Sequence, residues 1–517
     1  MKTGDYRRDR AAYTAALERA RYDYHTGVTP QLRLAPLRDR YADLWTRDAV
    51  DDLTRAREET PAQFETERTA LAALLRAAQL WYMEAHAEEV TNELARCTAS
   101  AHVEWDGMAL SPDEVPDALA AEPDAPRRRE LSARWFDALR ECSDLRAARL
   151  DTLRETARTL GYDSYFSFLS EIEETQLESL SVEADNFLAR TAHVYNANLF
   201  AWSARHLPAA FARALAYADS LFFMRLAHLD LFFPAGELRA TYDATMRGLG
   251  IRIEGQHNLR PETIANETGS ARTAVCFALN PPEDVRLVYR NEGGARFYQD
   301  FFEAAGRAQH FAWVSRDLYA RYPELVRAPD EATRAGFSFL FGDLLKDVEW
   351  LAAHRRVRPS EASEIARTLA LVELHRTRRA CVQLREQRAL EQAPDPRSEQ
   401  LPESYATAFE EATGFRAHTS LHLRDLIPDN SHDTHENARL PPAVYLRARL
   451  FSTALGEYLR TRYGHRWWRE RAAADELIDM WNTGSRYTVE ELASLVGLGA
   501  LDFDLLADLM EAVITRE

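Results

Sequence analysis

The chain has 517 residues, of which 46% are apolar and 28% charged, so it can bury a substantial core and has the composition of a globular protein. Its formal net charge of −18 argues against a nucleic-acid partner, because neutralising phosphates requires clustered lysine and arginine side chains. Only two of the 64 basic residues are lysine, Lys2 and Lys346, and we attribute this bias to arginine-rich coding rather than to function.

Three features of the sequence predict a cytoplasmic protein without a membrane partner. The N-terminal stretch MKTGDYRRDR contains no apolar signal region. The most apolar window, 221–233, is interrupted by Arg225 and Asp230 and is too short to span a bilayer. The cysteines lie far apart without a CxxC pair, which argues against a disulfide framework or zinc knuckle and fits a reducing cytosol: Cys97, Cys142, Cys276 and Cys381.

Helical patterns dominate from the N-terminus onward. Thr60 and Pro61 resemble an N-cap followed by proline at the first helical position, with Gln63 completing a capping box before an amphipathic stretch that reaches Cys97. Apolar residues at helical spacing predict further helices over 126–160, 181–206, 208–229, 361–391, 404–413, 442–463 and 489–514.

One region predicts β-structure. Residues 271–279 and 284–290 alternate apolar and polar side chains, and the turn-forming sequence NPPE separates them. Three polar, proline-containing stretches predict loops, at 106–126, 392–403 and 426–442, but none has the length or low complexity of an interdomain linker. The pattern predicts one large, mainly α protein with a small sheet.

The segment after the predicted strands has an arrangement known from zinc peptidases. A Gly-Gly pair leads into a helix that contains FFEAAGRAQH, residues 301–310. An edge strand can hold an extended peptide by backbone hydrogen bonds while the next helix presents side chains to it. In zinc peptidases that helix carries HExxH, in which two histidines one turn apart bind the metal and the glutamate activates a water molecule.

Several segments, in one order along the chain, resemble the thimet-oligopeptidase and oligoendopeptidase family of zinc metallopeptidases. LNPPEDVRLVYRNEGGARFYQDFFEAAGRAQHFAW resembles the family's strand-and-helix segment, and TRAGFSFLFGDLLKDVEWL resembles the segment that carries its third metal ligand. EPDAPRRRELSARWFDAL, LGYDSYFSFL, VYLRARLFSTALGEYLRTRYGHRWW and ELIDMWNTG also resemble family segments.

The resemblance implies a mainly α, two-lobed, clam-like fold of the thimet-oligopeptidase/neurolysin type. It implies a deep central channel with a small β-sheet beside the degenerate site. Residues 1–517 then form a single peptidase-like domain. The N-terminal helical lobe covers about 1–180, and the lobe with the former active-site helix covers about 181–517.

The family's functional residues are mostly replaced in this chain. The first histidine ligand falls on Glu303, and the general-base glutamate falls on Ala304. The second histidine falls on Arg307, and the third ligand falls on Ala335 when the segments are aligned by their glycine. Glu331 lies close enough in sequence to leave the third position open.

These replacements predict that zinc-dependent hydrolysis is absent and that no metal or other cofactor is bound there. Alanine has no donor atom, arginine cannot ligate zinc, and one carboxylate cannot hold a metal that needs about three protein ligands. No HExxH occurs elsewhere in the chain. Glu303 and Arg307 are spaced i, i+4 with the acid first, which predicts an ion pair in the space of the metal.

Four other residues are candidate ligand-binding positions: His310, Tyr445, Arg447 and Glu331. His310 lies on the same helical face as Glu303 and is either a ligand contact or a hydrogen-bonded histidine beside the channel. Tyr445 and Arg447 match the family's YLRA segment, where arginine can bind a carboxylate, or they are structural residues of a helix bundle.

Two further features carry alternatives. His432 and His435 lie in the polar stretch SHDTHEN, which is either a substitute metal site, as an alternative to one at Glu331, or a solvated loop. Cys276 lies in a predicted edge strand and is either a small apolar filler or, with His310 as base, a nucleophile.

Three functions therefore remain open on the sequence. The first is a degenerate relative that binds a peptide or peptide-like small molecule in the channel. The second is an enzyme whose channel performs metal-free chemistry, for example in specialised biosynthesis. The third is a residual metallopeptidase with substitute ligands.

Overall fold

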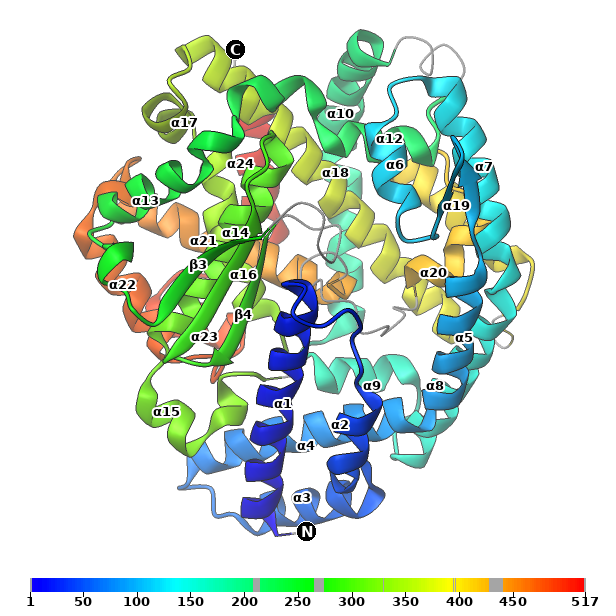
Figure 1. Ribbon diagram of the computed structural model, residues 1–517, viewed down its shortest axis with the longest axis vertical. Coiled ribbons are helices and arrows are strands. Elements are labelled where there is room, and N and C mark those ends of the chain that lie inside the picture. The colour runs from blue at the N-terminus through cyan, green and yellow to red at the C-terminus, as the bar shows by residue number, and fades with distance from the viewer. Residues whose placement is uncertain are drawn as a thin grey trace.

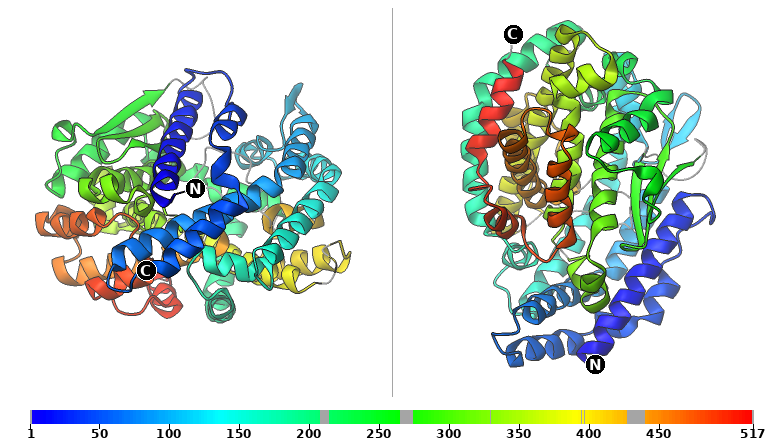
Figure 2. Two further views of the ribbon diagram at one scale, coloured as in Figure 1. Left: turned by 90° about the horizontal axis from the view of Figure 1, so that it is seen from below. Right: turned by 90° about the vertical axis from the view of Figure 1, so that its left-hand side faces the viewer.

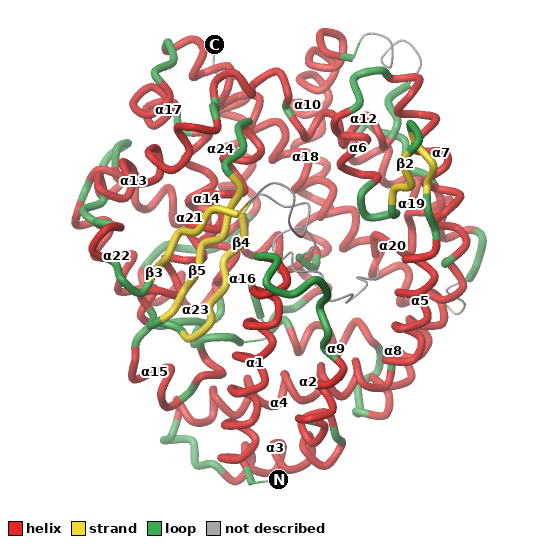
Figure 3. The backbone as a smooth tube through the Cα atoms, viewed as in Figure 1, coloured by secondary structure: helices red, strands yellow, loops and turns green. Residues whose placement is uncertain are grey.

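The computed structural model describes residues 2–207, 214–264, 274–328, 330–393, 395, 397–426 and 440–515. The mainly α class predicted from the sequence is confirmed, because helices make up most of the described chain and the strands form only two small sheets (Figures 1 and 3). No helix of the described residues has the length and apolar character needed to cross a membrane.

The N-terminal part is helical apart from one short hairpin, β1 (Val103–Trp105) with β2 (Met108–Leu110). Its helices are α1 (Thr3–His25), α2 (Ala35–Arg40), α3 (Arg47–Glu59), α4 (Glu65–His86), α5 (Glu88–Ser100), α6 (Val115–Ala121), α7 (Ala125–Glu141), α8 (Ser143–Thr159), α9 (Tyr165–Ile172) and α10 (Leu177–His206).

The remainder surrounds a three-stranded sheet. Its strands are β3 (Leu259–Ile264), β4 (Ala274–Asn280) and β5 (Asp284–Arg290). Its helices are α12 (Tyr217–Arg225), α13 (Leu238–Gly248), α14 (Ala295–Trp313), α15 (Arg316–Arg321), α16 (Ala332–Gly342), α17 (Val348–Arg355), α18 (Pro359–Gln392), α19 (Gln400–Thr413), α20 (His422–Leu426), α21 (Pro442–Tyr463), α22 (Arg471–Asn482), α23 (Val489–Val496) and α24 (Phe503–Ile514). A short 3-10 helix, η6 (Asp343–Lys346), follows α16 directly.

Most helix predictions are confirmed, but one predicted helix begins later than expected and two others are each two helices. The expected start at Thr60 is wrong, because Thr60 ends α3 by donating its backbone N–H to the Ala56 carbonyl, and α4 begins at Glu65. The predicted helix over 126–160 is interrupted at Cys142, between α7 and α8. The predicted helix over 489–514 is interrupted at Gly497, whose φ of 75° favours glycine and ends α23.

Both predicted strands are present, and a third strand joins them. The strand order is β3-β5-β4, with β3 parallel and β4 antiparallel to β5, so β4 is an edge among the described strands. Side chains of β4 alternate between two cores: Cys276 and Ala278 belong to the main core with α14, whereas Phe277 packs against Tyr22 of α1. Helix α1 therefore lies beside β4, as Figure 1 shows.

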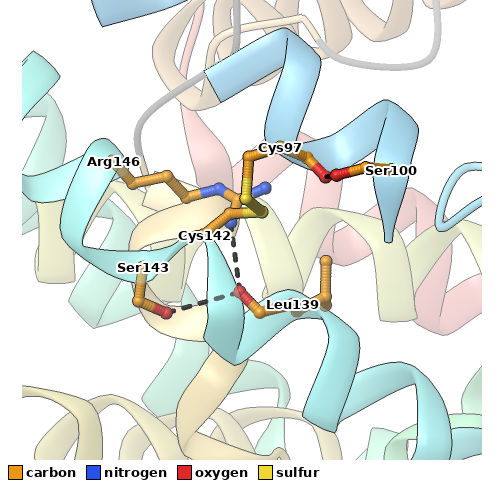
Figure 4. The surroundings of a disulfide bond; sticks show 6 residues. All are labelled: Cys97, Ser100, Leu139, Cys142, Ser143 and Arg146. Carbon is orange, nitrogen blue, oxygen red and sulfur yellow. Dashed lines mark hydrogen bonds between the residues drawn. A yellow bond between two sulfur atoms is a disulfide. The ribbon is translucent and has the colours of Figure 1, made fainter. Parts of the chain in front are cut away.

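The absence of disulfides expected from the sequence is contradicted. Cys97 of α5 and Cys142, between α7 and α8, form a disulfide with Cα atoms 6.0 Å apart (Figure 4). The two residues are 45 positions apart in sequence, so only the packing of α5 against α8 brings them together. Disulfides persist in oxidising compartments, and this bond removes the cysteine argument for a reducing cytosol. Cys276 and Cys381 are both buried and take no part in this disulfide.

Reducing the disulfide should destabilise the protein by about 2–4 kcal/mol, because the bond closes a long loop and restricts the unfolded chain. Urea unfolding with and without a thiol reductant measures this difference. The Cys97→Ser/Cys142→Ser double variant is the control and should unfold at the same urea concentration in both conditions. An equal midpoint for the wild-type protein with and without reductant would contradict the prediction.

Candidate functional site

The segment that resembles a metal-binding helix lies on α14, which is buried between the sheet and α16. All four sequence-predicted positions on α14 are inaccessible: Glu303 is 7% exposed, Ala304 3%, Arg307 1% and His310 0%. The close approach of α14 to α16 requires Gly306, because a Cβ there would lie 2.7 Å from the Phe337 carbonyl oxygen. The helix pair that would carry a metal site is thus closely packed in this chain.

Helix α16 carries the predicted third-ligand positions. Ala335 is fully buried and offers only a methyl group. Glu331 lies at the N-cap of α16, where its carboxylate accepts a hydrogen bond from Arg334 at 2.9 Å.

Glu303 points toward the C-terminal end of α16 rather than along α14. A Cβ at Gly342 would lie 2.7 Å from the Glu303 Cγ, so the absence of a side chain at Gly342 makes room for the carboxyl group. Gln299 donates a hydrogen bond from Nε2 to Glu303 Oε1 at 3.0 Å. Burial raises the pKa of Glu303 to about 8, and nearby Asp300 adds to the rise while Arg296 opposes it.

The predicted ion pair between Glu303 and Arg307 is wrong. Both residues are described, and the interactions of the Glu303 carboxyl are with Gln299 and with the charges around it rather than with Arg307. Because a buried carboxyl with a pKa near 8 is protonated at neutral pH, Glu303 does not supply the negative charge that the pair would need. Arg307 is itself buried and has other interactions.

A buried polar cluster connects this position to two further helices. Tyr445 of α21 donates its hydroxyl hydrogen bond to Glu373 Oε1 of α18. Arg449 of α21 lies 3.0 Å from the same Glu373 oxygen through Nη2 and 2.7 Å from Asp343 Oδ1 through Nη1. The glutamate and the arginine are 1% exposed, so each charge is balanced inside the protein.

Sequence reasoning found Tyr445 in this cluster but missed Glu373, Arg449 and Asp343. A signal was present for Glu373, because it interrupts the apolar run LALVELH on a helix where an acidic residue facing the core needs a partner. Arg449 lies two residues beyond Arg447 in the segment VYLRAR. Arg447 and Arg449 lie on different faces of α21. Arg447 contacts Glu490 on α23, whereas Arg449 contacts Asp343 in η6.

Arg447 holds together three segments of the chain. Its guanidinium donates to both carboxylate oxygens of Glu490 on α23, at 2.7 Å each, and to the backbone carbonyl of Glu173 at 2.6 Å. It also lies 3.1 Å from Asp330 Oδ2, just before α16. These contacts give Arg447 a structural role, and its contact with a ligand stays a prediction.

His310 is placed as a structural histidine. Its Nε2–H donates to the Gly484 carbonyl at 3.0 Å, and its ring lies 5.0 Å from the ring of Phe337. Burial lowers the pKa of His310 to about 3, so the ring is neutral at physiological pH. This arrangement matches the hydrogen-bonded alternative given for His310 above.

The donor set does not fit a zinc ion. Ala304 and Ala335 have no ligand atom, Arg307 carries a positive charge, and Glu303 is a protonated carboxyl at neutral pH. Within the described ranges, no group of three or more His, Cys, Asp or Glu residues could hold a metal ion. His432 and His435 lie outside the described residues, so the substitute site proposed for them stays a prediction.

Comparisons with known proteins place the fold among peptidases. No family model and no curated protein match the sequence. Among solved structures, metallocarboxypeptidase 1 of Trypanosoma cruzi is similar with a TM-score of 0.60 and 15% identity, covering 99% of each chain. PZ peptidase A, solved with an inhibitor, is similar with a TM-score of 0.60 and 13% identity, covering 90% of this chain and 83% of its own. The chain thus has a metallopeptidase-like fold.

Proposed function

We propose that this protein is a degenerate relative of the thimet-oligopeptidase type that binds a peptide or peptide-like small molecule without zinc-dependent hydrolysis. The observation that carries the proposal is that the four positions expected to bind and activate zinc do not form a zinc donor set. These positions lie on the closely packed helices α14 and α16: Glu303, Ala304, Arg307 and Ala335. The scaffold of a peptidase is retained, as the similar solved structures support, while the groups needed for metal binding are replaced.

The two-lobed shape with a central channel belongs to the same proposal. The peptide would lie along β4, which has only β5 as a neighbour among the described strands and can add one more strand. Backbone hydrogen bonds of this kind recognise a peptide largely independently of its side chains. Neither nucleic acid nor a membrane is part of the proposed function. A cytoplasmic location remains a proposal, and the Cys97–Cys142 disulfide weighs against it.

A second candidate is a metal-free enzyme, and the protonated Glu303 favours it. A carboxyl with a pKa of about 8 can donate a proton near neutral pH, as general acids in enzymes do. Glu303 lies in the electrostatic field of Glu373 and Arg449, so the cluster contains both an acid and a charged carboxylate. Fold likeness alone does not distinguish this candidate from the first.

Metal analysis combined with a mixed-peptide assay separates these functions. We expect the purified protein, incubated with zinc and then desalted, to retain far less than one zinc per chain and to show no chelator-sensitive cleavage. Peptides that bind should raise its melting temperature, since a ligand at one hundred times its Kd adds about 2.7 kcal/mol of stability.

Each alternative result has a defined meaning. Stoichiometric zinc with chelator-sensitive cleavage would contradict the proposed function. Turnover that persists without metal and is lost in Glu303→Gln would support the metal-free enzyme instead. Glu457→Gln, which replaces an exposed carboxylate on α21, is the matched control and should behave as the wild-type protein in all three measurements.

A further inference from the structure

A cavity of about 90 Å³ lies outside the α14 site. It is enclosed by η6, α18, α21 and α24, and no residue of α14 or of the sheet lines it. One wall is apolar and comes from the C-terminal helix α24, with Leu506, Leu509 and Met510. In Figure 2 the red α24 runs alongside the orange and yellow-green helices that form the other walls.

Two basic residues of the cavity lining are partly accessible. Lys346 and Arg460 have side chains that are 17% and 32% exposed, whereas Leu340 and Ser452 in the interior are 2% and 1% exposed. The lining therefore combines partly accessible basic groups with buried apolar side chains.

Hydrogen-bond donors outnumber acceptors around this cavity. Lys346 gives one contact, to Asp343 at 2.6 Å, and Arg460 gives one, to Glu457 at 3.1 Å, although their groups carry three and five donors. Arg449 Nε is buried and has no hydrogen-bond partner among the described residues.

The acceptors are already engaged. Asp343 is shared between Lys346 and Arg449, and these two cations outweigh the effect of burial, so the pKa of Asp343 is lowered and it stays charged. Asp347 accepts the backbone N–H of Trp350 at 2.9 Å and caps α17. A ligand with acceptor atoms and a negative charge could use the remaining donors of Lys346 and Arg460.

We propose that this cavity binds a short-chain aliphatic carboxylate. The carboxylate lies between Lys346 and Arg460 at the entrance, and the hydrocarbon chain packs against α24. An engineered cavity of about 150 Å³ accepts the six carbons of benzene, so the smaller volume here fits about three to five carbons beyond the carboxyl group, as in butanoate to hexanoate. This site is separate from the proposed peptide site, although Arg449 contacts both the cavity and Glu373.

Calorimetric titration of the full chain with sodium hexanoate tests the proposal. Hexanoate is expected to bind, and butanoate should bind about fourfold more weakly for each CH₂ that it lacks. Hexylammonium chloride has the same chain with the opposite charge and should bind at least tenfold more weakly. Equal binding of hexanoate and hexylammonium, or no binding of hexanoate at millimolar concentration, would overturn the proposal.

Gly456 of α21 allows the cavity to be filled from one wall. A Cβ at Gly456 would lie 3.7 Å from Leu340 Cδ1, so Gly456→Ala is accommodated and should bind hexanoate nearly as the wild-type protein does. Gly456→Leu should fill the cavity and abolish binding. Undiminished binding by a Gly456→Leu protein with an unchanged circular dichroism spectrum would overturn the proposal.

A charge variant at the entrance keeps the test independent of cavity filling. Lys346→Gln removes the cation and should weaken hexanoate binding by about tenfold or more, the effect of a charge-assisted hydrogen bond. Binding of 1-hexanol, which has no charge, should change little. Lys346→Arg retains the positive charge, so its affinity for hexanoate should be within about threefold of the wild-type affinity. Equal hexanoate affinities of the Gln and Arg variants would overturn the assignment of Lys346.

Discussion

Replacing Arg447 by methionine is expected to lower the free energy of unfolding by about 3–5 kcal/mol, the usual cost of removing one partner of a buried ion pair. Arg447 is 1% exposed and holds Glu490, Asp330 and the Glu173 carbonyl together. Burial already raises the pKa of Glu173 to about 8, and Arg447 is the main group that opposes this rise. Without the guanidinium, the carboxyls of Glu490 and Asp330 would lose a close positive charge, and the Glu173 carbonyl would lose a hydrogen-bond donor.

Urea unfolding at neutral pH measures the effect. Arg462→Met, on the same helix α21, is the matched control, because its side chain is 58% exposed and lies 3.6 Å from Glu476. An exposed pair of this kind contributes about 1 kcal/mol or less. A loss for Arg447→Met no larger than that for Arg462→Met would show that the join between α9, α21 and α23 does not depend on this arginine.

The Glu303→Gln variant should respond to pH differently from the wild-type protein. In the folded protein the pKa of Glu303 is about 8, against an ordinary value of 4.5. The folded state therefore holds this proton more tightly than the unfolded state does. The resulting stabilisation is fully present below pH 4.5, declines as the pH rises, and is lost above about pH 8.

Glutamine keeps the hydrogen bond from Gln299 but has no proton to lose. Between pH 5.5 and 7.5 the wild-type protein should therefore lose about 2–3 kcal/mol of stability relative to the variant, at up to 1.4 kcal/mol per pH unit. Unfolding curves at several pH values give this difference directly. Glu457→Gln controls for the loss of one exposed ionisable group, and parallel pH profiles for Glu303→Gln and wild-type protein would contradict a raised pKa at Glu303.

Sequence patterns predicted those helices and strands whose ends are determined by residues within or next to the element itself. The predicted helix over 442–463 coincides with α21, which starts at Pro442 and ends before Gly464, where φ is 84°. The strand pair β4 and β5 was also predicted, because alternation and a turn lie within one short segment. Strand β3 was not, because it contains Pro261 and pairs with a strand some twenty residues later in the chain.

The candidate site likewise has features that the sequence predicts and features that depend on residues distant in the chain. The residues at 303, 304 and 307 are read directly from the sequence, and the fold likeness to peptidases agrees with the resemblance that drew attention to them. The position of the Glu303 carboxyl could not be read in this way, because it depends on space left by Gly342 on another helix. The ionic contacts of Arg449 with Asp343 and Glu373 likewise join residues more than 70 positions apart.

The Cys97–Cys142 bond also determines how the chain behaves when it is cut. The segment between these cysteines contains β1, β2, α6 and α7, and many arginines that trypsin recognises. A single cleavage there leaves two polypeptides joined through sulfur, which migrate as one molecule until a thiol is added. Fragment patterns from electrophoresis under oxidising conditions would therefore overlook such a cut, and preparations that look intact should be compared after reduction.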